Sequence, residues 1–408
     1  MQLIRSFRAL RSTPESAGRV AAPPYDVLDS EEARLLVGEN ADSFLHVSKP
    51  EIDFPPGTDP HAPEVHARGR ANLDRLIGDG LLCRDDAPCL YVYRLVMGEH
   101  TQTGVVVAAS VAAYLDGRIR LHEHTKDDKV DDRARNADAL DAHTGTLFLT
   151  HRADSEIDGL VAGCVAQQAT VDVTGEDGVR HTLWVVSEPV ALAAAFNAMP
   201  AVYIADGHHR SAAAAKLYEW RQERRAAGED VGGADWFLAV IFPDDQVQIL
   251  PYNRVVSTLG GRTADELVAA LRDAFTVAPS GDAVQPERPG VFGLYLAGRW
   301  YRLEIAASRV PADALGRLDI NLLGANCLGP LLGIEDQRTD DRIDFVGGIR
   351  GLVELERRVD SGEMKAAFSL YPTQLADVLT VADLGQVMPP KSTWFEPKLR
   401  DGLVVLPL

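Results

Sequence analysis

The most chemically dense segment of the chain is the string Asp-Gly-His-His-Arg at 206–210, which follows an apolar run at 201–205. Gly207 permits a positive φ or a close approach of the backbone to a ligand. The alanine-rich stretch that begins at Ser211 is typical of a helix, and the free N–H groups at a helix start attract anions. We therefore predict a phosphate site formed by Gly207, His208, Arg210 and Ser211.

Three side chains of this segment suit proton transfer or charge stabilisation. The guanidinium of Arg210 is a planar fork that matches phosphate oxygens, and His209 exchanges protons near neutral pH. A carboxylate repels phosphate, so Asp206 is explained if it takes a proton from an incoming hydroxyl or binds a metal. We predict Asp206 and His209 as catalytic residues. The alternative is that Asp206 only caps the helix and the histidines are simply exposed.

A second segment, residues 122–133, is rich in acids and histidines. Its His-Glu-His start does not have the spacing of an HExxH zinc helix. If 122–124 is strand-like, His122 and His124 share one face. If the following residues are helical, Asp128 and Asp132 share a face and offer oxygen ligands to Mg²⁺. The alternative is a solvated charged turn that leads into a helix. His143 and Thr144 are further candidates for the same cleft.

The tail at 388–399 combines cationic, hydroxyl and aromatic side chains with three prolines that fix its backbone. We predict that it closes over a phosphate or a base, with phosphate contacts from Lys391, Ser392 and Thr393, and with Trp394, Phe395 and Lys398 beside them. The alternative is a packed C-terminal arm with surface lysines. The early stretch 19–26 has a similar character through Tyr25 and Asp26, whereas His46 is expected in a core.

The hydrophobic pattern predicts a mixed α/β fold. A buried strand at 201–205, the polar loop, a helix to about 225 and a strand at 237–242 form one α/β unit with a site at its loop. Other expected elements are a capping box at 29–32, a helix at 64–82, a hairpin of 90–97 with 104–114, a linker at 278–290 and a hairpin of 293–297 with 300–305.

Composition narrows the function classes. The 408 residues carry 46% hydrophobic and 25% charged residues, which is the balance of a globular protein. The net charge of −19 disfavours nucleic-acid binding because the chain repels a polyanion. The four cysteines are scattered singly, as expected for buried reduced thiols. With no signal-peptide pattern at the start and no long apolar run, we expect a cytoplasmic protein that does not contact membranes.

The chain resembles a bacterial and archaeal family known as domain of unknown function 1015. The resemblance rests on six stretches that span nearly the full length: RVAAPPYDV at 19–27, SFLHV at 43–47, ADGHHRSAAAA at 205–215, LPYNRVV at 250–256, RIDFVGGIRGL at 342–352 and MPPKSTWFEPKL at 388–399. The loop at 206–210 is also similar to the phosphate loop of the ParB/sulfiredoxin superfamily, which includes free serine kinases with the same five residues.

This second resemblance implies a small-molecule phosphotransferase, either a serine kinase or a phosphoserine phosphatase. It implies a nucleotide or pyrophosphate partner, with ATP, ADP and pyrophosphate as candidate donors, and Mg²⁺ as cofactor. It also implies a separate catalytic glutamate, for which Glu123 is our choice. The loop lacks the cysteine that sulfiredoxins need, and the acidic charge opposes DNA partitioning. The alternative function is a non-catalytic nucleotide-sensing regulatory module.

The resemblance also suggests a domain plan. We expect an N-terminal α+β domain with the acidic segment at 1–155, a ParB/sulfiredoxin-like core with the polar loop at 156–310, and a C-terminal α/β portion with a closing arm at 311–408. The sequence leaves the oligomeric state open.

Overall fold

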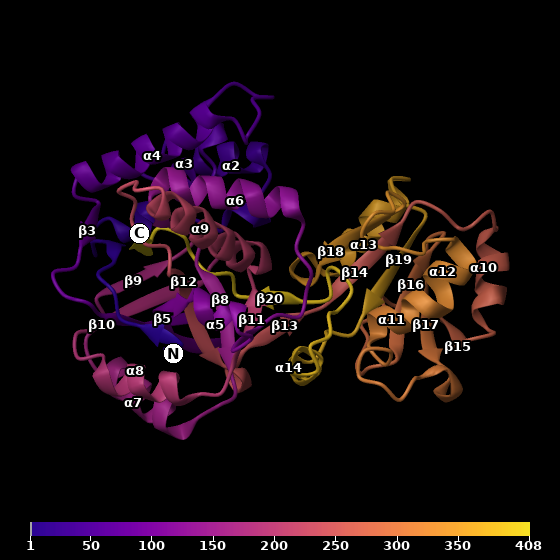
Figure 1. The fold of residues 1–408 in the computed structure, drawn as a ribbon. Helices are drawn as coiled ribbons and strands as arrows, with labels where there is room; N and C mark the ends of the chain where they lie inside the picture. Colours follow the sequence, from indigo (N-terminus) through magenta and orange to yellow (C-terminus); the bar gives the residue numbers. More distant parts are fainter. Residues whose placement is uncertain (1) are drawn as a thin grey trace. The chain divides into compact units, whose positions relative to one another are not determined.

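The computed structural model describes residues 2–408, and contacts between Cα atoms divide the chain into two units (Figure 1). Unit 1 consists of Met1–Leu121, Thr125–Val247 and Pro397–Leu408, and unit 2 of His122–His124 and Gln248–Glu396. Both units are therefore discontinuous in sequence. The architecture is mixed α/β, as predicted.

The main sheet of unit 1 has the strand order β6-β11-β8-β12-β5-β4-β10-β9, and β1 pairs with β5. Its centre is built from β-branched and apolar residues that are fully buried, as in the run Val105–Ala109. The strands are β1 (Ile4–Arg5), β4 (Leu90–Met97), β5 (His100–Ser110), β6 (Ile119–Arg120), β8 (Leu147–His151), β9 (Val171–Thr174), β10 (Arg180–Val186), β11 (Val202–Asp206) and β12 (Trp236–Pro243).

Helices cover both faces of this sheet (Figure 1). On one side α9 contacts β8 and β12 and packs against α6, which in turn packs against α4; on the other side α7 and α8 pack together. The helical segments of unit 1 are α1 (Ala17–Val20), η1 (Tyr25–Val27), α2 (Ser30–Val37), α3 (Leu45–Ser48), η2 (Pro50–Asp53), α4 (Pro63–Gly78), α5 (Val111–Leu115), α6 (Asp127–Leu140), α7 (Ser155–Val165), α8 (Val190–Ala198), α9 (His208–Ala226) and η3 (Asp244–Gln246).

A smaller sheet of order β3-β2-β21-β7 joins distant parts of unit 1. Its strands are β2 (Leu10–Ser12), β3 (Leu82–Arg84), β7 (Ala142–His143) and β21 (Val404–Pro407). Because β21 pairs with β2 and β7, the last residues of the chain return to the unit that holds the first ones. This pairing brings the segment 397–408 to the polar loop.

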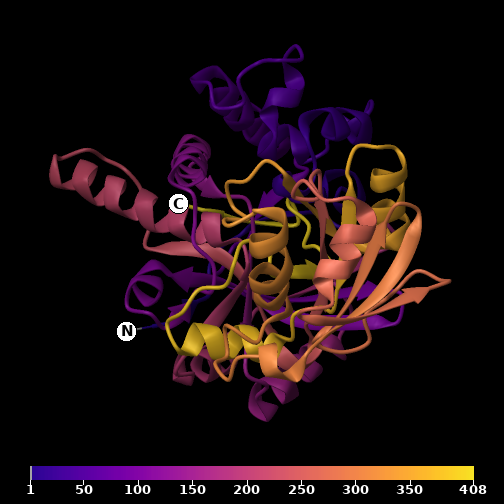
Figure 2. The ribbon, with the colours of Figure 1, turned by 90° about the vertical axis from the view of Figure 1, so that its right-hand side faces the viewer.

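Unit 2 is built on a sheet of order β15-β17-β16-β19-β14-β18, and the orange strands of this sheet are seen in Figure 2. A separate ribbon pairs β13 with β20. The strands of unit 2 are β13 (Gln248–Leu250), β14 (Tyr252–Val256), β15 (Phe275–Ser280), β16 (Val291–Leu296), β17 (Arg299–Ile305), β18 (Ile343–Gly347), β19 (Ala366–Leu370) and β20 (Trp394–Glu396). Its helical segments are α10 (Ala264–Leu271), η4 (Ala307–Arg309), α11 (Asp319–Leu323), the π-helical η5 (Gly324–Leu328), α12 (Gly329–Leu332), η6 (Gly348–Arg350), α13 (Gly351–Asp360) and α14 (Leu375–Asp383).

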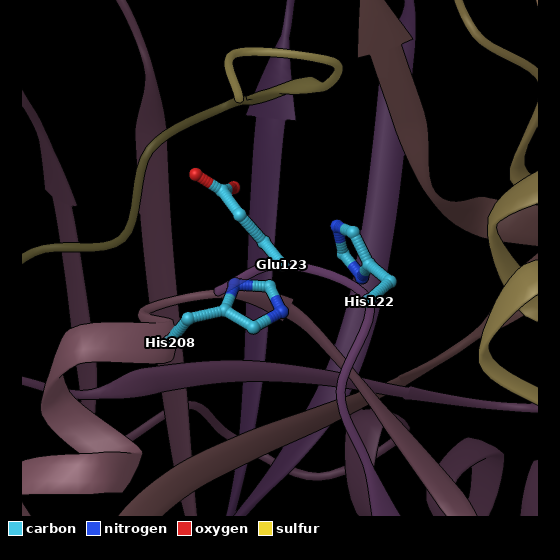
Figure 3. A group of neighbouring side chains, drawn as sticks. All are labelled: His122, Glu123 and His208. Carbon is cyan, nitrogen blue, oxygen red and sulfur yellow. The ribbon is translucent and has the colours of Figure 1, made fainter. Parts of the chain in front are cut away.

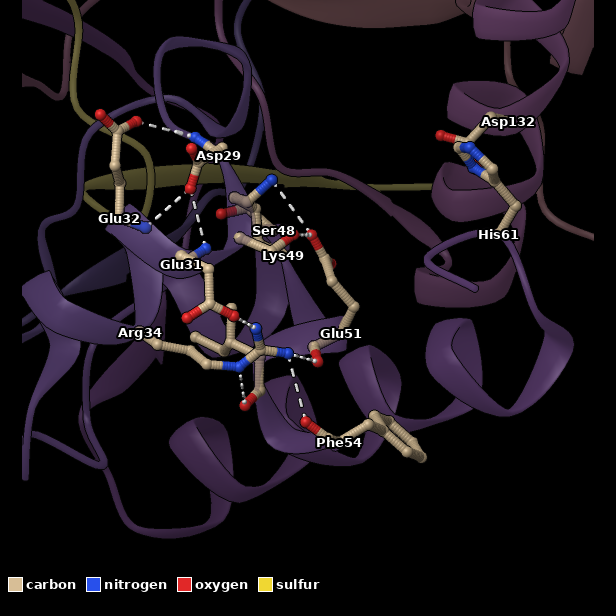
Figure 4. A network of polar contacts seen from close by, with 12 residues as sticks. Asp29, Glu31, Glu32, Arg34, Ser48, Lys49, Glu51, Phe54, His61 and Asp132 are labelled. Atoms are coloured by element: carbon tan, nitrogen blue, oxygen red, sulfur yellow. Dashed lines mark hydrogen bonds and ion pairs between the residues drawn. The ribbon is translucent and has the colours of Figure 1, made fainter. Parts of the chain in front are cut away.

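Several elements that were predicted from local sequence patterns are present in the structure. The capping box at the start of α2 is confirmed, since the Asp29 carboxylate accepts from the N–H groups of Glu31 and Glu32 and the Glu32 carboxylate accepts from the N–H of Asp29 (Figure 4). The hairpin through Gly98 is confirmed, although its second strand ends at Ser110 and a short helix follows. The helix expected at 64–82 ends at Gly78.

Three expectations are wrong. The boundaries predicted at 155/156 and 310/311 each fall inside a unit, because β8 and β11 share one sheet and the chain crosses between units near 247 and 397. The predicted linker at 278–290 lies within unit 2, where its first residues belong to β15. All four cysteines are free, as expected, but Cys83 is exposed and not buried. Residues 122–124 form no strand, so the shared face considered for His122 and His124 does not arise.

No helix in residues 2–408 combines the length and the apolar character that a membrane-spanning helix requires.

Candidate active site at the polar loop

The polar loop lies at a strand-to-helix junction of unit 1, as predicted. β11 ends at Asp206, Gly207 has a φ of +99°, and α9 begins at His208. The positive φ is readily adopted by glycine and strained for other residues. β11 also has an irregular register against β8 between Ile204 and Asp206, which changes the direction of the strand just before the loop. The first N–H groups of a 19-residue helix therefore begin beside the Asp206 carboxylate.

Asp206 is paired with a lysine from the far end of the chain. The Nζ atom of Lys398 lies 3.0 Å from Oδ2 of Asp206, and the Asp206 side chain is 34% exposed. Burial alone would raise the pKa of Asp206, but the charges of Lys398 and Arg210 outweigh it and hold the pKa below its usual range. Asp206 is therefore ionised at neutral pH, and the ammonium of Lys398 lies beside it.

Arg210 is directed inward from the first turn of α9. Its Nη1 donates to the carbonyl of Thr146, its Nη2 lies 3.5 Å from Oδ2 of Asp26, and its buried Nε has no partner within residues 2–408. Burial would lower the pKa of Arg210, but the carboxylates of Asp26 and Asp206 raise it above its usual value. The guanidinium is only loosely paired with Asp26, so it retains a free donor for a ligand.

Two glycines make room for this guanidinium. A Cβ added to Gly207 would lie 3.1 Å from Arg210 Nε, and a Cβ added to Gly145 would lie 3.1 Å from Arg210 Cδ. Both are closer than a relaxed side chain tolerates. The absence of a side chain at Gly145 and Gly207 therefore allows the Arg210 guanidinium to occupy its position.

A cavity of about 40 Å³ opens next to Arg210 and is lined entirely by residues of unit 1. Its polar lining comes from Tyr25, Ser48, Arg133, Asn136, His143, Thr144, Arg210 and Asp401. The Cζ atom of Arg133 lies 4.2 Å above the ring of Tyr25, and burial raises the pKa of that tyrosine to about 12. This volume holds a few ordered waters or one small functional group. Tyr25, His143 and Thr144, which the sequence analysis singled out, all line this cavity.

The cavity is also lined by two buried titratable side chains, His143 and Asp401, whose pKa values are shifted and whose polar atoms are incompletely hydrogen-bonded. Burial and the charge of Arg221 lower the pKa of His143 to about 4, and its Nε2 has no partner within the described residues. Asp401 is 1% exposed, and neither of its carboxylate oxygens has a well-formed hydrogen bond there. Burial raises the pKa of Asp401 to about 7, and Arg210 offsets only part of this effect. Asp401 therefore gains or loses its proton near neutral pH.

The histidines of the loop differ in their surroundings. His208 is buried at the start of α9, whereas Nε2 of the half-buried His209 accepts the N–H of Lys126 at 3.1 Å. This bond brings the second half of the acidic segment to the polar loop. Ser211 does not offer its hydroxyl to a phosphate, because the side chain is buried and donates to the carbonyl of His208 at 2.9 Å. The prediction for Ser211 is wrong, since a hydroxyl in the first turn of a helix bonds readily to the backbone.

The acidic segment is split between the units. Figure 3 shows the side chain of His208 at the start of α9, in unit 1, and those of His122 and Glu123, which group with unit 2. Asp128 and Asp132 lie in α6, as predicted, but Asp128 is exposed and Asp132 is buried. Asp132 already pairs with the imidazole of His61 and the guanidinium of Arg133.

The predicted phosphate ligands of the tail lie in unit 2. Lys391 has a φ of +56°, and its Nζ lies 5.7 Å from the ring centroid of Tyr252. The Ser392 hydroxyl donates to the carbonyl of Pro389, and its own carbonyl accepts from Thr373. Roles for Lys391, Ser392 and Thr393 at the loop therefore stay predictions. His46 is half-buried and pairs with Asp53 at 2.5 Å rather than lying in a core.

The profile of the family described as "Protein of unknown function (DUF1015)" matches residues 4–321, which is most of the chain. The chain belongs to this family. No curated protein matches the DUF1015 chain.

Solved structures resemble the chain only distantly. A free serine kinase in complex with AMP is 12% identical and covers 74% of this chain and 92% of its own, with a TM-score of 0.37. A conserved hypothetical protein from Pyrococcus furiosus is 13% identical and covers 74% and 95%, with a TM-score of 0.36. SbnI from Staphylococcus aureus, truncated at its C-terminus, is 10% identical and covers 72% and 85%, with a TM-score of 0.39.

The sequence analysis of the DUF1015 chain did not predict Asp401 or Arg133 at the candidate site, and it did not list Lys398 among the phosphate ligands. Asp401 and Arg133 sit in ordinary charged contexts, so no local motif marks them. Lys398 belongs to the tail that we singled out, but the prediction ranked Lys391 above it. The signal that separates the two lysines is strand pairing, because β20 ends at Glu396 and the chain then leaves unit 2.

Asp401→Asn is expected to remove a pH dependence of stability. The pKa of Asp401 is raised to about 7 in the folded chain, above its value in an unfolded chain, so folding stability falls as pH rises from about 4 to about 7 and then levels off. Each pKa unit of this difference is worth about 1.4 kcal/mol. The variant should therefore be more stable than wild type at pH 8 and lose that advantage near pH 4. Thermal melts across this range measure the effect, and parallel curves would refute it.

Gly207→Ala is expected to weaken phosphate binding beyond its cost in stability. A non-glycine residue at a positive φ costs roughly 1–2 kcal/mol, and the new Cβ also pushes against Arg210. Gly228→Ala is the matched control, since Gly228 has a φ of +88° with nothing near its Cβ position. Both variants should melt earlier than wild type, but only Gly207→Ala should bind pyrophosphate more weakly in a calorimetric titration. Equal affinities in the two variants would separate Gly207 from the site.

Proposed function

We propose that the DUF1015 chain is a small-molecule phosphotransferase that acts at the polar loop of unit 1. Its substrates are a phosphoryl donor (ATP, ADP or pyrophosphate) and a small metabolite with a hydroxyl group, for which serine is the leading candidate. The reverse or hydrolytic reaction, from phosphoserine, uses the same groups with another acceptor.

The observation that carries this proposal is the ion pair of Asp206 with Lys398 at the start of α9. A carboxylate beside a helix N-terminus and an arginine would repel phosphate unless something neutralises it. Lys398 provides that charge at 3.0 Å, so the anion site and the base coexist. A structural cap alone would not require a lysine held from 192 residues away in sequence.

The pair suggests how the base becomes active. When donor phosphates bind at the helix start, their charge attracts the ammonium of Lys398 away from Asp206. Burial then dominates and raises the pKa of Asp206, which makes the carboxylate a better proton acceptor. The substrate hydroxyl transfers its proton to Asp206 while its oxygen forms a bond to phosphorus, and the bond from phosphorus to the leaving oxygen of the donor breaks.

Positive charge for the transferred phosphoryl group comes from Arg210, Lys398 and the N–H groups at the start of α9. The N–H of Lys126 donates to Nε2 of His209 and so orients this imidazole, which we propose for proton exchange. Glu123, which groups with unit 2, stays a prediction as the second carboxylate.

The predicted Mg²⁺ ligands do not fit that ion. Mg²⁺ prefers six oxygen ligands, whereas Asp132 already has imidazole and guanidinium partners and Asp128 is exposed. The steps above therefore involve only side chains of the chain, and Mg²⁺ enters the assay as the usual companion of nucleotide phosphates.

Incubation of the full chain with each donor, Mg²⁺ and a panel of small hydroxyl metabolites tests the function. We expect loss of donor phosphate that depends on a hydroxyl acceptor, with serine the most effective. A chain that binds donors, as measured by a rise in its melting temperature, but turns over neither them nor phosphoserine is instead the nucleotide sensor.

A further inference from the structure

A second cavity of unit 1 lies between α7 and the main sheet, outside the polar loop (Figure 1 labels α7). Its volume is about 160 Å³, and its lining comes from α7, α8 and the strands β4, β5, β8 and β12. Within α7, whose residues are all described, only Ile157 is buried. The helix therefore leaves room between itself and the strands that it covers.

Most of the wall of this cavity is apolar. The apolar side chains that line it are those of Val105, Ile157, Val161, Val165, Phe196 and Ile241. An apolar cavity of about 150 Å³ admits a ligand the size of benzene. The cavity under α7 therefore has room for a branched aliphatic or a small aromatic group, and burial of that group stabilises the complex.

The guanidinium of Arg94 is held at the wall of this cavity by two contacts. Its Nε donates to Oγ1 of Thr103 at 3.1 Å, and its Cζ lies 5.4 Å from the ring centroid of Trp184. Within residues 2–408 no carboxylate pairs with Arg94, and its two terminal nitrogens have no hydrogen-bond partner. Because the guanidinium fork matches a carboxylate, Arg94 offers that group a donor whose orientation is already fixed.

His151 and Asp158 provide acceptors in the same cavity. The His151 side chain is 1% exposed, and its Nδ1 donates to the carbonyl of Arg152 at 2.8 Å, which leaves the lone pair of Nε2 for a ligand. Burial lowers the pKa of His151, so the imidazole is neutral at neutral pH. Asp158, from the first turn of α7, forms no ion pair with Arg94 or with any other residue of the described chain. Opposite charges thus line one cavity without neutralising each other.

We propose that this cavity binds a hydrophobic α-amino acid. The carboxylate of the ligand pairs with Arg94, its ammonium group donates to Asp158 and to Nε2 of His151, and its side chain occupies the apolar part. A carboxylic acid without an ammonium group would leave Asp158 unpaired, and an amine would leave Arg94 unpaired, so the site favours the zwitterion. The proposal does not depend on the phosphotransferase function, because it concerns other residues and a different ligand.

Calorimetric titration of the full chain with L-leucine tests this site. Wild type should bind one equivalent with a Kd below about 1 mM. 4-Methylpentanoate lacks the ammonium group and 3-methylbutylamine lacks the carboxylate, so each should bind at least about 10-fold more weakly through the loss of a charged hydrogen bond. Glycine has both charges but no side chain, and it should bind more weakly because it leaves the apolar wall uncovered.

Arg94→Met and Asp158→Asn separate the two charged contacts. Arg94→Met keeps the length of the side chain without its charge, so it should weaken leucine binding at least about 10-fold without weakening the binding of 3-methylbutylamine. Asp158→Asn should weaken leucine binding in the same way without weakening the binding of 4-methylpentanoate. Glu156→Gln is the matched control, because Glu156 is exposed in the same turn of α7 and does not line the cavity. It should bind leucine as wild type does.

Ala162→Leu fills the cavity from α7, whereas Gly163→Leu adds the same side chain at the next position, where a Cβ would meet nothing within 4 Å. Only Ala162→Leu should abolish leucine binding, and Arg94→Met keeps the proposal testable if Ala162→Leu does not fold. The proposal is overturned if wild type does not bind leucine, if Arg94→Met or a folded Ala162→Leu binds it as tightly as wild type, or if 4-methylpentanoate binds as tightly as leucine.

Discussion

Asp206→Asn is expected to lower the rate of phosphoryl transfer by about 10²–10⁴-fold, the usual loss on removal of a general base. The amide retains the shape of the carboxylate but cannot take the hydroxyl proton. Donor affinity should hold or rise, because a negative charge beside the phosphates is removed and Lys398 loses its competing partner. Initial rates and calorimetric affinities from one preparation measure both quantities.

Asp245→Asn is the control for this change. Asp245 is an exposed residue of η3 in the same unit, so its substitution removes an equal charge without touching the loop. It should leave rate and affinity unchanged. An Asp206→Asn variant that retains the wild-type rate would reduce Asp206 to a helix cap and refute the proposed mechanism.

Arg210→Ala is expected to weaken donor binding by about 2–5 kcal/mol, the range for truncating one member of a buried charged pair. This corresponds to roughly 30- to 5,000-fold in the dissociation constant. The variant loses the guanidinium and also leaves the Asp26 carboxylate unpaired, which adds repulsion against the phosphates. The donor affinity of Arg210→Lys should lie between those of Arg210→Ala and wild type, because lysine keeps the positive charge but not the forked guanidinium.

Arg224→Ala serves as the comparison. Arg224 lies in the same helix, α9, and pairs with Asp138 and Glu229 away from the cavity. It should bind donors as wild type does. If Arg210→Ala also binds pyrophosphate, ADP and ATP with wild-type affinity, the buried guanidinium holds the fold together and takes no part in the site.

The strand, loop and helix at 202–226 could be predicted because each depends on neighbouring residues. The apolar run forms a buried strand, Gly207 supplies the positive φ, and the alanines favour the helix. The capping box at Asp29 is local in the same sense. Ser211 shows the limit of such reasoning. Its residue type suits phosphate, but its hydroxyl donates to the backbone carbonyl of His208, and the residue type alone does not decide between these two partners.

Long-range pairing could not be predicted from one sequence. The tail looks continuous, yet β20 pairs with β13 in unit 2 whereas β21 pairs with β2 and β7 in unit 1. This division puts Lys398 in unit 1, where it pairs with Asp206, and Lys391 in unit 2. Asp401 lines the cavity for the same reason, because it lies just before β21, which pairs in unit 1. Local patterns do not encode these partners, which lie hundreds of residues away.

Phosphorus-31 NMR of the full chain with serine, Mg²⁺ and a saturating donor tests the central claim most directly. The account predicts a growing phosphoserine signal that matches the loss of the donor signal, at least about 100-fold faster than with Asp206→Asn. Spectra in which the donor is bound yet no new phosphorus signal forms, from serine and donor or from phosphoserine alone, would contradict it.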